Sequence, residues 1–203
     1  MHAGAILHGC SILVRTMSAD DHQDPEPAGE LPVPVDELLP ELYEELRGLA
    51  QQLFASERRG HTLQPTALVH EVFLQLSARA ALRAESREHV LALAARSMRR
   101  ILVDSARRRG AAKRGGDRLR VTLSGALRDA GAGPDEIDVL TLDELLHDFA
   151  KTYPRHAEIV ELRFFGGLEV KETAQALGVS ASTVMSDWRF ARAWLAQALG
   201  DAS

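Results

Sequence analysis

The chain has 203 residues, of which 45% are hydrophobic and only 5% aromatic, and its formal net charge is −5. This length and the scarcity of aromatic and β-branched residues predict an all-α protein made of two small helical domains. The single cysteine, Cys10, excludes an internal disulfide, and the longest apolar run is too short to span a membrane, so we expect a cytoplasmic protein.

Charge is distributed unevenly along the chain. Ten acidic and no basic residues lie between Asp20 and Glu45, whereas ten basic and two acidic residues lie between Arg96 and Arg120. Because the field at a binding surface depends on local charge, the basic segment can bind nucleic acid although the whole chain is acidic. One hypothesis is that the acidic N-terminal tail, residues 1–35, shields the basic segment in the free protein.

Three helices are expected after a proline-rich, acidic segment, residues 1–35, that we predict to be disordered. Together they form a first domain over residues 36–110. Leucines at positions 38, 42, 46, 49 and 53 recur at the spacing of an amphipathic helix. A second helix is predicted to begin at Pro65, and a third to run from about Arg87 to Arg109.

The third helix is predicted to have two different faces. Val90, Ala94 and Ile101 lie on one side, and a group of arginines lies roughly opposite. Contact with DNA phosphates is the natural use of such a group and would make affinity fall steeply with salt. The alternative is an ordinary solvated face. The candidate residues in this helix and its tail are Arg96, Arg99, Arg100, Arg107, Arg108 and Arg109.

A glycine-rich segment, residues 111–136, predicts a flexible linker to a second domain over residues 137–200. Helices are predicted there around Leu142–Phe149, from Pro154 to the Gly166-Gly167 pair, over Glu169–Leu177 and over Ser182–Leu199.

The last two of these helices have the spacing of a helix-turn-helix. The small side chain of Ala174 permits close approach, Gly178 can take a positive φ, and Val184 faces inward. Ser180 or Ser182 can cap the second helix. The alternative is an ordinary helical hairpin with a glycine turn.

The second helix of this motif would present a polar surface to DNA. An apolar stripe containing Val184, Trp188, Ala191 and Leu195 is predicted to lie in the core. The residues outside the stripe suit the major groove, where arginine reads guanine and serine or threonine contacts bases or phosphates. They are Ser182, Thr183, Met185, Ser186, Arg189 and Arg192.

Several blocks, in the same order, resemble the extracytoplasmic-function (ECF) group of the sigma-70 family. The resemblance covers about residues 36–198. The blocks that carry it are Leu63–Leu74, Met98–Asp104 with the arginines that follow, Val160–Leu168 and Ser182–Leu195.

The resemblance implies a protein that binds core RNA polymerase and directs it to promoter DNA. It implies that the last helix reads the −35 element and that the basic helix with its tail holds the −10 element. Glu71 and Gln75 are the implied contacts with polymerase, and Phe73 is expected in the core. The free protein is expected to be a monomer without cofactor or metal, and an anti-sigma factor or other regulator is a further candidate partner.

Two features of the sequence depart from the family pattern. Met185 stands where a basic residue is frequent, and methionine cannot pair with a phosphate. Residues 77–90 contain no aromatic side chain, although similar proteins often have one there and single-stranded bases commonly stack on aromatic rings. His89 is the alternative stacking group.

Two other classes of protein are alternatives to a sigma factor. A conventional helix-turn-helix regulator would be a stable dimer on an operator and would not need polymerase. For an enzyme, the sequence lacks an HExxH motif, a phosphate-binding glycine loop and a Gly-x-Ser-x-Gly elbow. The neighbours His70 and Glu71 would diverge by about 100° on a helix, so no catalytic activity is expected.

Overall fold

The computed structural model describes residues 33–55, 63–78, 83–112, 118–123 and 136–201, and residues 31–203 form one compact unit. Helices make up most of the described chain, which confirms the predicted all-α class. Residues 1–32 of the segment predicted to be disordered, and most of the predicted linker, lie outside the described residues. Residues 33–35 of that segment are ordered instead, because they form β1 and the first residue of α1.

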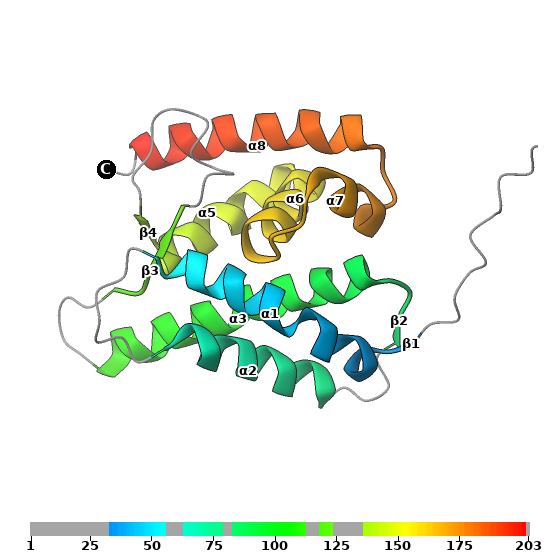
Figure 1. Ribbon diagram of the computed structural model, residues 1–203. Coiled ribbons are helices and arrows are strands. Elements are labelled where there is room, and N and C mark those ends of the chain that lie inside the picture. The colour runs from blue at the N-terminus through cyan, green and yellow to red at the C-terminus, as the bar shows by residue number, and fades with distance from the viewer. Residues whose placement is uncertain (1–32, 56–62, 79–82, 113–117, 124–135, 202–203) are drawn as a thin grey trace, which may run out of the picture. The chain divides into compact units, whose positions relative to one another are not determined.

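Three helices form a first helical unit. Helix α1 spans Val35–Leu53, α2 spans Pro65–Ser77 and α3 spans Arg87–Ala112 (Figure 1). As predicted, α2 begins at a proline, whose missing N–H has no helical partner to lose at that position. Helix α3 begins after Ser86, whose hydroxyl accepts a hydrogen bond from the backbone N–H of His89 at 3.2 Å.

In the described ranges, two short antiparallel strand pairs accompany the helices, and we did not predict them from the sequence. Strand β1 (Val33–Pro34), immediately before α1, pairs with β2 (Arg83–Ala84), which lies shortly before α3. Strand β3 (Arg120–Thr122) pairs with β4 (Glu136–Asp138), and β4 leads directly into α5. The second pair therefore fixes where the second helical unit starts.

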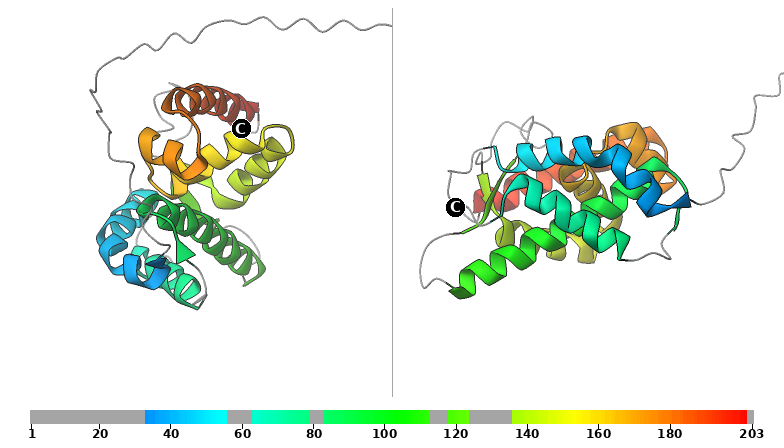
Figure 2. Two further views of the ribbon diagram at one scale, coloured as in Figure 1. Left: turned by 90° about the vertical axis from the view of Figure 1, so that its right-hand side faces the viewer. Right: turned by 60° about the horizontal axis from the view of Figure 1, so that its bottom comes forward.

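Four helices form the second helical unit. They are α5 (Val139–Thr152), α6 (Pro154–Phe165), α7 (Val170–Leu177) and α8 (Ala181–Asp201). Their positions agree closely with the predicted helices, including the start of α6 at a proline and its end before a glycine pair. Helices α5 and α6 lie between α3 and α8 (Figures 1 and 2).

The two helical units share one apolar core, in which α3 contacts both sets of helices. Gly166, after α6, lies so close to α3 that an added Cβ would be 2.9 Å from the Cβ of Ala95. The neighbouring Gly167 has a φ of +67° and lies against Leu49 of α1. The division into separate domains at residues 36–110 and 137–200 stays a prediction from the sequence.

Candidate nucleic-acid interface

The turn between α7 and α8 has the geometry that the sequence predicted. Gly178 adopts a left-handed conformation with a φ of +63°, which a residue without Cβ does at little cost. The backbone N–H of Val179 donates to the carbonyl of Ala174 at 3.0 Å and ends α7. Ser180 caps α8, because its hydroxyl accepts a hydrogen bond from the backbone N–H of Thr183 at 3.1 Å.

The inner face of α8 is buried as predicted. Val184, Trp188, Ala191 and Leu195 are each at most 6% exposed. This stripe fixes which side of the helix points to solvent.

Polar contacts from α6 fix the same rotation. Arg155 Nε donates to Oδ2 of the buried Asp187 at 2.7 Å, and His156 Nε2 lies 3.4 Å from Oδ1 of that carboxylate. The guanidinium of Arg163 lies 4.6 Å from the ring centroid of Trp188, in cation–π contact. Helix α8 therefore presents one defined outer face.

Four of the six residues that we predicted to face DNA from α8 are exposed. Thr183 is partly buried and its hydroxyl lies 2.8 Å from that of Ser180, so it serves the cap. Arg192 is also partly buried. The exposed four are Ser182, Met185, Ser186 and Arg189.

An aromatic cluster that we did not predict joins α5 to α8. Phe149 stacks on Trp194 with ring centroids 4.5 Å apart, and Phe190 meets Tyr153 edge-on at 4.9 Å. Phe190 is 40% exposed, so the cluster reaches the surface of α8. Its sequence signal is a four-residue spacing, which separates Phe149 from Tyr153, the residue after α5, and places Phe190 and Trp194 on a common face of α8.

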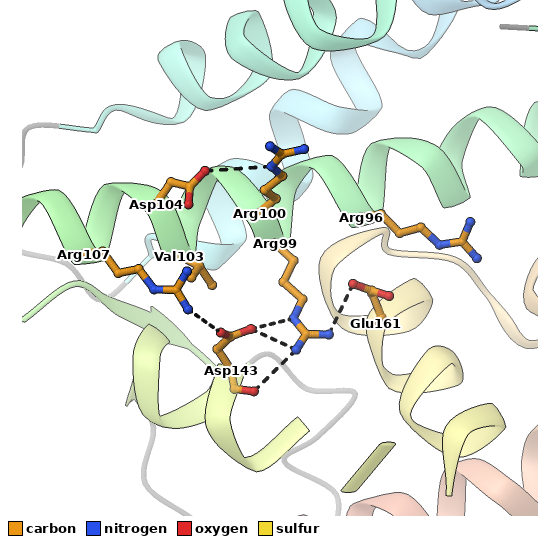
Figure 3. A pocket seen from close by; sticks show the side chains of 8 residues that line it. All are labelled: Arg96, Arg99, Arg100, Val103, Asp104, Arg107, Asp143 and Glu161. Atoms are coloured by element: carbon orange, nitrogen blue, oxygen red, sulfur yellow. Dashed lines mark hydrogen bonds and ion pairs between the residues drawn. The ribbon is translucent and has the colours of Figure 1, made fainter. Parts of the chain in front are cut away.

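The arginines on α3 have a different environment from those on α8. Arg99 donates from Nε and Nη2 to Oδ1 of Asp143 at 3.1 and 2.9 Å, and from Nη1 to Glu161 at 3.4 Å (Figure 3). Its side chain is 20% exposed, and those of its two acidic partners are 22% and 17% exposed. All three guanidinium nitrogens are thus bound to α5 and α6.

Two neighbouring arginines pair with the second helical unit in the same way. Arg107 Nη2 lies 3.5 Å from Oδ2 of Asp143, and Arg96 hydrogen-bonds to Glu158. These partners lie on α5 and α6, 36 and 62 residues further along the chain, and no local sequence signal points to them. The groups line an open cavity of about 480 Å³, formed by Arg96, Arg99, Arg100, Val103, Asp104, Arg107, Asp143 and Glu161 (Figure 3).

The remaining candidates on α3 divide into exposed and buried residues. Arg100 is 67% exposed and lies 3.9 Å from Asp104 in its own helix. Arg108 is exposed and donates from Nε to the carbonyl of Asp104 at 3.3 Å. Arg109 is only 8% exposed, so in this conformation it does not belong to the outer cationic surface.

A comparison with protein families gives this arrangement a context. The model of the family described as ECF sigma factor matches residues 33–201, which is most of the chain. The chain belongs to this family. The match confirms the resemblance and with it a function as a sigma factor in transcription initiation, in a family that is not enzymatic. Searches of curated proteins and of solved structures found no match.

Helix α2 of the sigma factor carries an exposed leucine. Leu74 is 70% exposed, and the predicted polymerase contacts Glu71 and Gln75 are partly buried beside it. Phe73 instead packs against the core, edge-on to Tyr43 with ring centroids 5.6 Å apart, as we expected. Leu74 therefore extends the predicted polymerase surface by one apolar side chain.

His89, the alternative stacking group, has a local structural role. Its Nδ1 accepts a hydrogen bond from the backbone N–H of Glu85 at 3.4 Å, in the turn that begins α3, and the residue is partly buried. Within the described ranges, no three His, Cys, Asp or Glu side chains gather as a metal site, and no helix is long and apolar enough to cross a membrane.

Proposed function

We propose that this sigma factor binds core RNA polymerase and directs it to promoter DNA in the bacterial cytoplasm. The observation that carries this proposal is the outer face of α8, which is held in one orientation from behind and stays accessible in front. Family membership indicates the process that such a surface would serve, which is transcription initiation.

The outer face of α8 is proposed to read the −35 element. A helix that follows a tight turn can enter the major groove, and exposed Arg189 can donate to the O6 and N7 atoms of guanine. Ser182 and Ser186 supply hydroxyl groups for bases or phosphates. Met185, which is 50% exposed, offers an apolar contact such as a thymine methyl in place of a phosphate contact.

The basic helix α3 is proposed to hold the −10 region through phosphates. Arg100 and Arg108 already face solvent, whereas Arg96, Arg99 and Arg107 are bound to acidic residues of the second helical unit. A phosphate group requires the same guanidinium donors that those carboxylates occupy. Full engagement of α3 therefore requires that the two helical units move apart.

The exposed side of α2 is proposed to dock on polymerase. Leu74 supplies an apolar contact at its centre, and Glu71 and Gln75 supply polar contacts beside it. An apolar anchor surrounded by polar groups is the usual composition of a protein-binding surface.

Run-off transcription with reconstituted core polymerase tests the proposal. Wild-type protein should direct initiation from specific genomic fragments, and Arg189→Ala should lower recognition of the upstream element by roughly 5- to 100-fold, the range for one bidentate base contact. Lys151→Ala is the matched control, because it removes one positive charge from an exposed position on α5. Promoter selectivity that survives Arg189→Ala would contradict the assignment of α8.

The oligomeric state and polymerase binding separate a sigma factor from a dimeric operator-binding regulator. The free protein should elute as a monomer and should co-purify with core polymerase. Leu74→Asp should weaken that co-purification and leave the fold intact, because the side chain is 70% exposed. A stable dimer that ignores polymerase would favour the regulator.

A further inference from the structure

The structure contains a contact between the proposed DNA-binding arginines and acidic residues of the same chain. We name this contact the ionic seam: Arg96, Arg99 and Arg107 on α3, with Asp143 on α5 and Glu158 and Glu161 on α6. We propose that the ionic seam is an autoinhibitory lock, in which the three carboxylates occupy the places that DNA phosphates take when α3 binds DNA. This inference rests on the proposed function and adds its regulation.

The geometry at Arg99 makes the two states mutually exclusive. Nε, Nη1 and Nη2 all donate to carboxylates, and Nη2 also approaches the backbone carbonyl of Asp143 at 3.4 Å. A phosphate would need the same fork of donors, and it would also be repelled by Asp143 and Glu161. DNA can therefore reach this arginine only after α5 and α6 have moved away.

The rest of the seam is arranged for release. The side chains of Arg96 and Arg107 are 47% and 64% exposed, so their ion pairs are weak and screened by salt. The cavity of about 480 Å³ between the pairs is open to solvent and lined mainly by charged groups. A dense field of phosphates can compete for such groups, whereas it could not enter a close-packed apolar interface.

We call the arrangement in which the two helical units are in contact the closed form. Apolar packing holds this form together in addition to the ion pairs. Gly166 lets the end of α6 approach Ala95 of α3, and the neighbouring glycine lies against Leu49 of α1. The seam and this packing both join the second helical unit to the first, so separation of the two units would release both together. The closed form thus presents the face of α8 and withholds much of the face of α3.

Binding to a labelled DNA duplex of random sequence tests the lock, because phosphate contact does not depend on sequence. The open variant is Asp143→Asn with Glu161→Gln, which removes the partners of Arg99 and Arg107. The control is Glu144→Gln with Asp148→Asn, which removes the same charge from exposed positions on α5. Duplex affinity of the open variant should exceed that of the control by about tenfold, because α3 gains phosphate contacts that the closed control lacks.

The salt dependence of binding identifies which arginines are released. The slope of log affinity against log salt should steepen by about 0.9 for each arginine that gains a phosphate. Adding Arg99→Ala to the open variant should reverse one such step. Equal affinity and slope in the open variant and the control would overturn the lock, as would a gain that Arg99→Ala leaves in place.

Two further measurements keep the outcome interpretable. Glu158→Gln alone affects only the exposed pair with Arg96 and should give a smaller gain than the open variant, while circular dichroism confirms that each variant is folded.

Run-off transcription by the wild type separates the two proposals. Transcription with unchanged duplex binding in the open variant would reject the lock alone, whereas no transcription together with a gain in duplex binding would reject the proposed function alone.

Discussion

Helices α3 and α8 both carry arginines at outward helical positions, but the fold treats the two groups differently. Arg189 on α8 is exposed. Arg99 on α3 is bound to Asp143 and Glu161, and all three side chains are at most 22% exposed. A helical position therefore shows where a guanidinium points, whereas the distant elements packed there decide what it binds.

Replacing the two arginines separately gives the largest expected contrast. Arg99→Ala leaves two partly buried carboxylates close together, so we expect it to lower the free energy of unfolding by about 1.5–3 kcal/mol. Arg189→Ala removes an exposed side chain and should change that free energy by less than about 0.5 kcal/mol. Urea denaturation followed by circular dichroism measures both.

A third substitution shows whether the positive charge alone, or also the planar guanidinium group, causes the contrast. Arg99→Lys keeps the positive charge but loses the planar fork, so it should recover only part of the lost stability. Equal stabilities for the alanine variants at positions 99 and 189 would remove the distinction between the two surfaces.

The helix-turn-helix could be predicted closely because its determinants are local. Gly178, Ser180 and Val184 lie within seven residues, and each acts through its own backbone or the adjacent turn. The helices that begin at Pro65 and Pro154 were predictable for the same reason. Helical periodicity also identified the buried face of α8.

The environment of α3 could not be predicted, because its determinants are distant in sequence. The partners of Arg99 lie 44 and 62 residues further along the chain, and an acidic residue on an amphipathic helix ordinarily indicates a solvated face. The pairing of β3 with β4 was missed for a different reason. Leu119, Val121 and Leu123 are buried in strict alternation, a signal that a glycine-rich surrounding segment obscured.

The local character of the turn can itself be tested by a substitution of intermediate effect. An added Cβ at Gly178 would meet no atom within 4 Å, so only its φ of +63° opposes a larger residue. Gly178→Ala should therefore cost about 1 kcal/mol through backbone strain alone. The melting temperature, measured by differential scanning calorimetry, and recognition of the −35 element should both decrease.

The matched control for that substitution is Gly48→Ala in α1. This position is helical and equally open, so alanine there should raise the free energy of unfolding by about 0.5–1 kcal/mol. The same chemical change thus has opposite signs in the turn and in the helix. A stabilising Gly178→Ala would show that the turn relaxes out of the left-handed conformation.

Glu172 connects α3 to α7 of the helix-turn-helix, and its expected effect on stability is small. It lies in the first turn of α7, where Oε2 accepts from the backbone N–H of Glu169 at 2.8 Å, and Oε1 accepts from Arg87 of α3 at 2.7 Å. Burial alone would raise the pKa of Glu172, but the hydrogen bonds from Glu169 and Arg87 outweigh burial and place it below the ordinary value. The ionised carboxylate therefore stabilises the folded state.

A lowered pKa in the folded state sets the sign of the pH dependence. The stabilisation is complete above the ordinary glutamate pKa of about 4.3 and is lost as pH falls through the lower folded value. Glu172→Gln should thus cost up to about 1 kcal/mol near neutral pH, and the difference from wild type should shrink toward about pH 3. Glu144→Gln, at an exposed position on α5, is the matched control. A difference at position 172 that stays constant with pH would mean that the carboxylate charge does not connect α7 to α3.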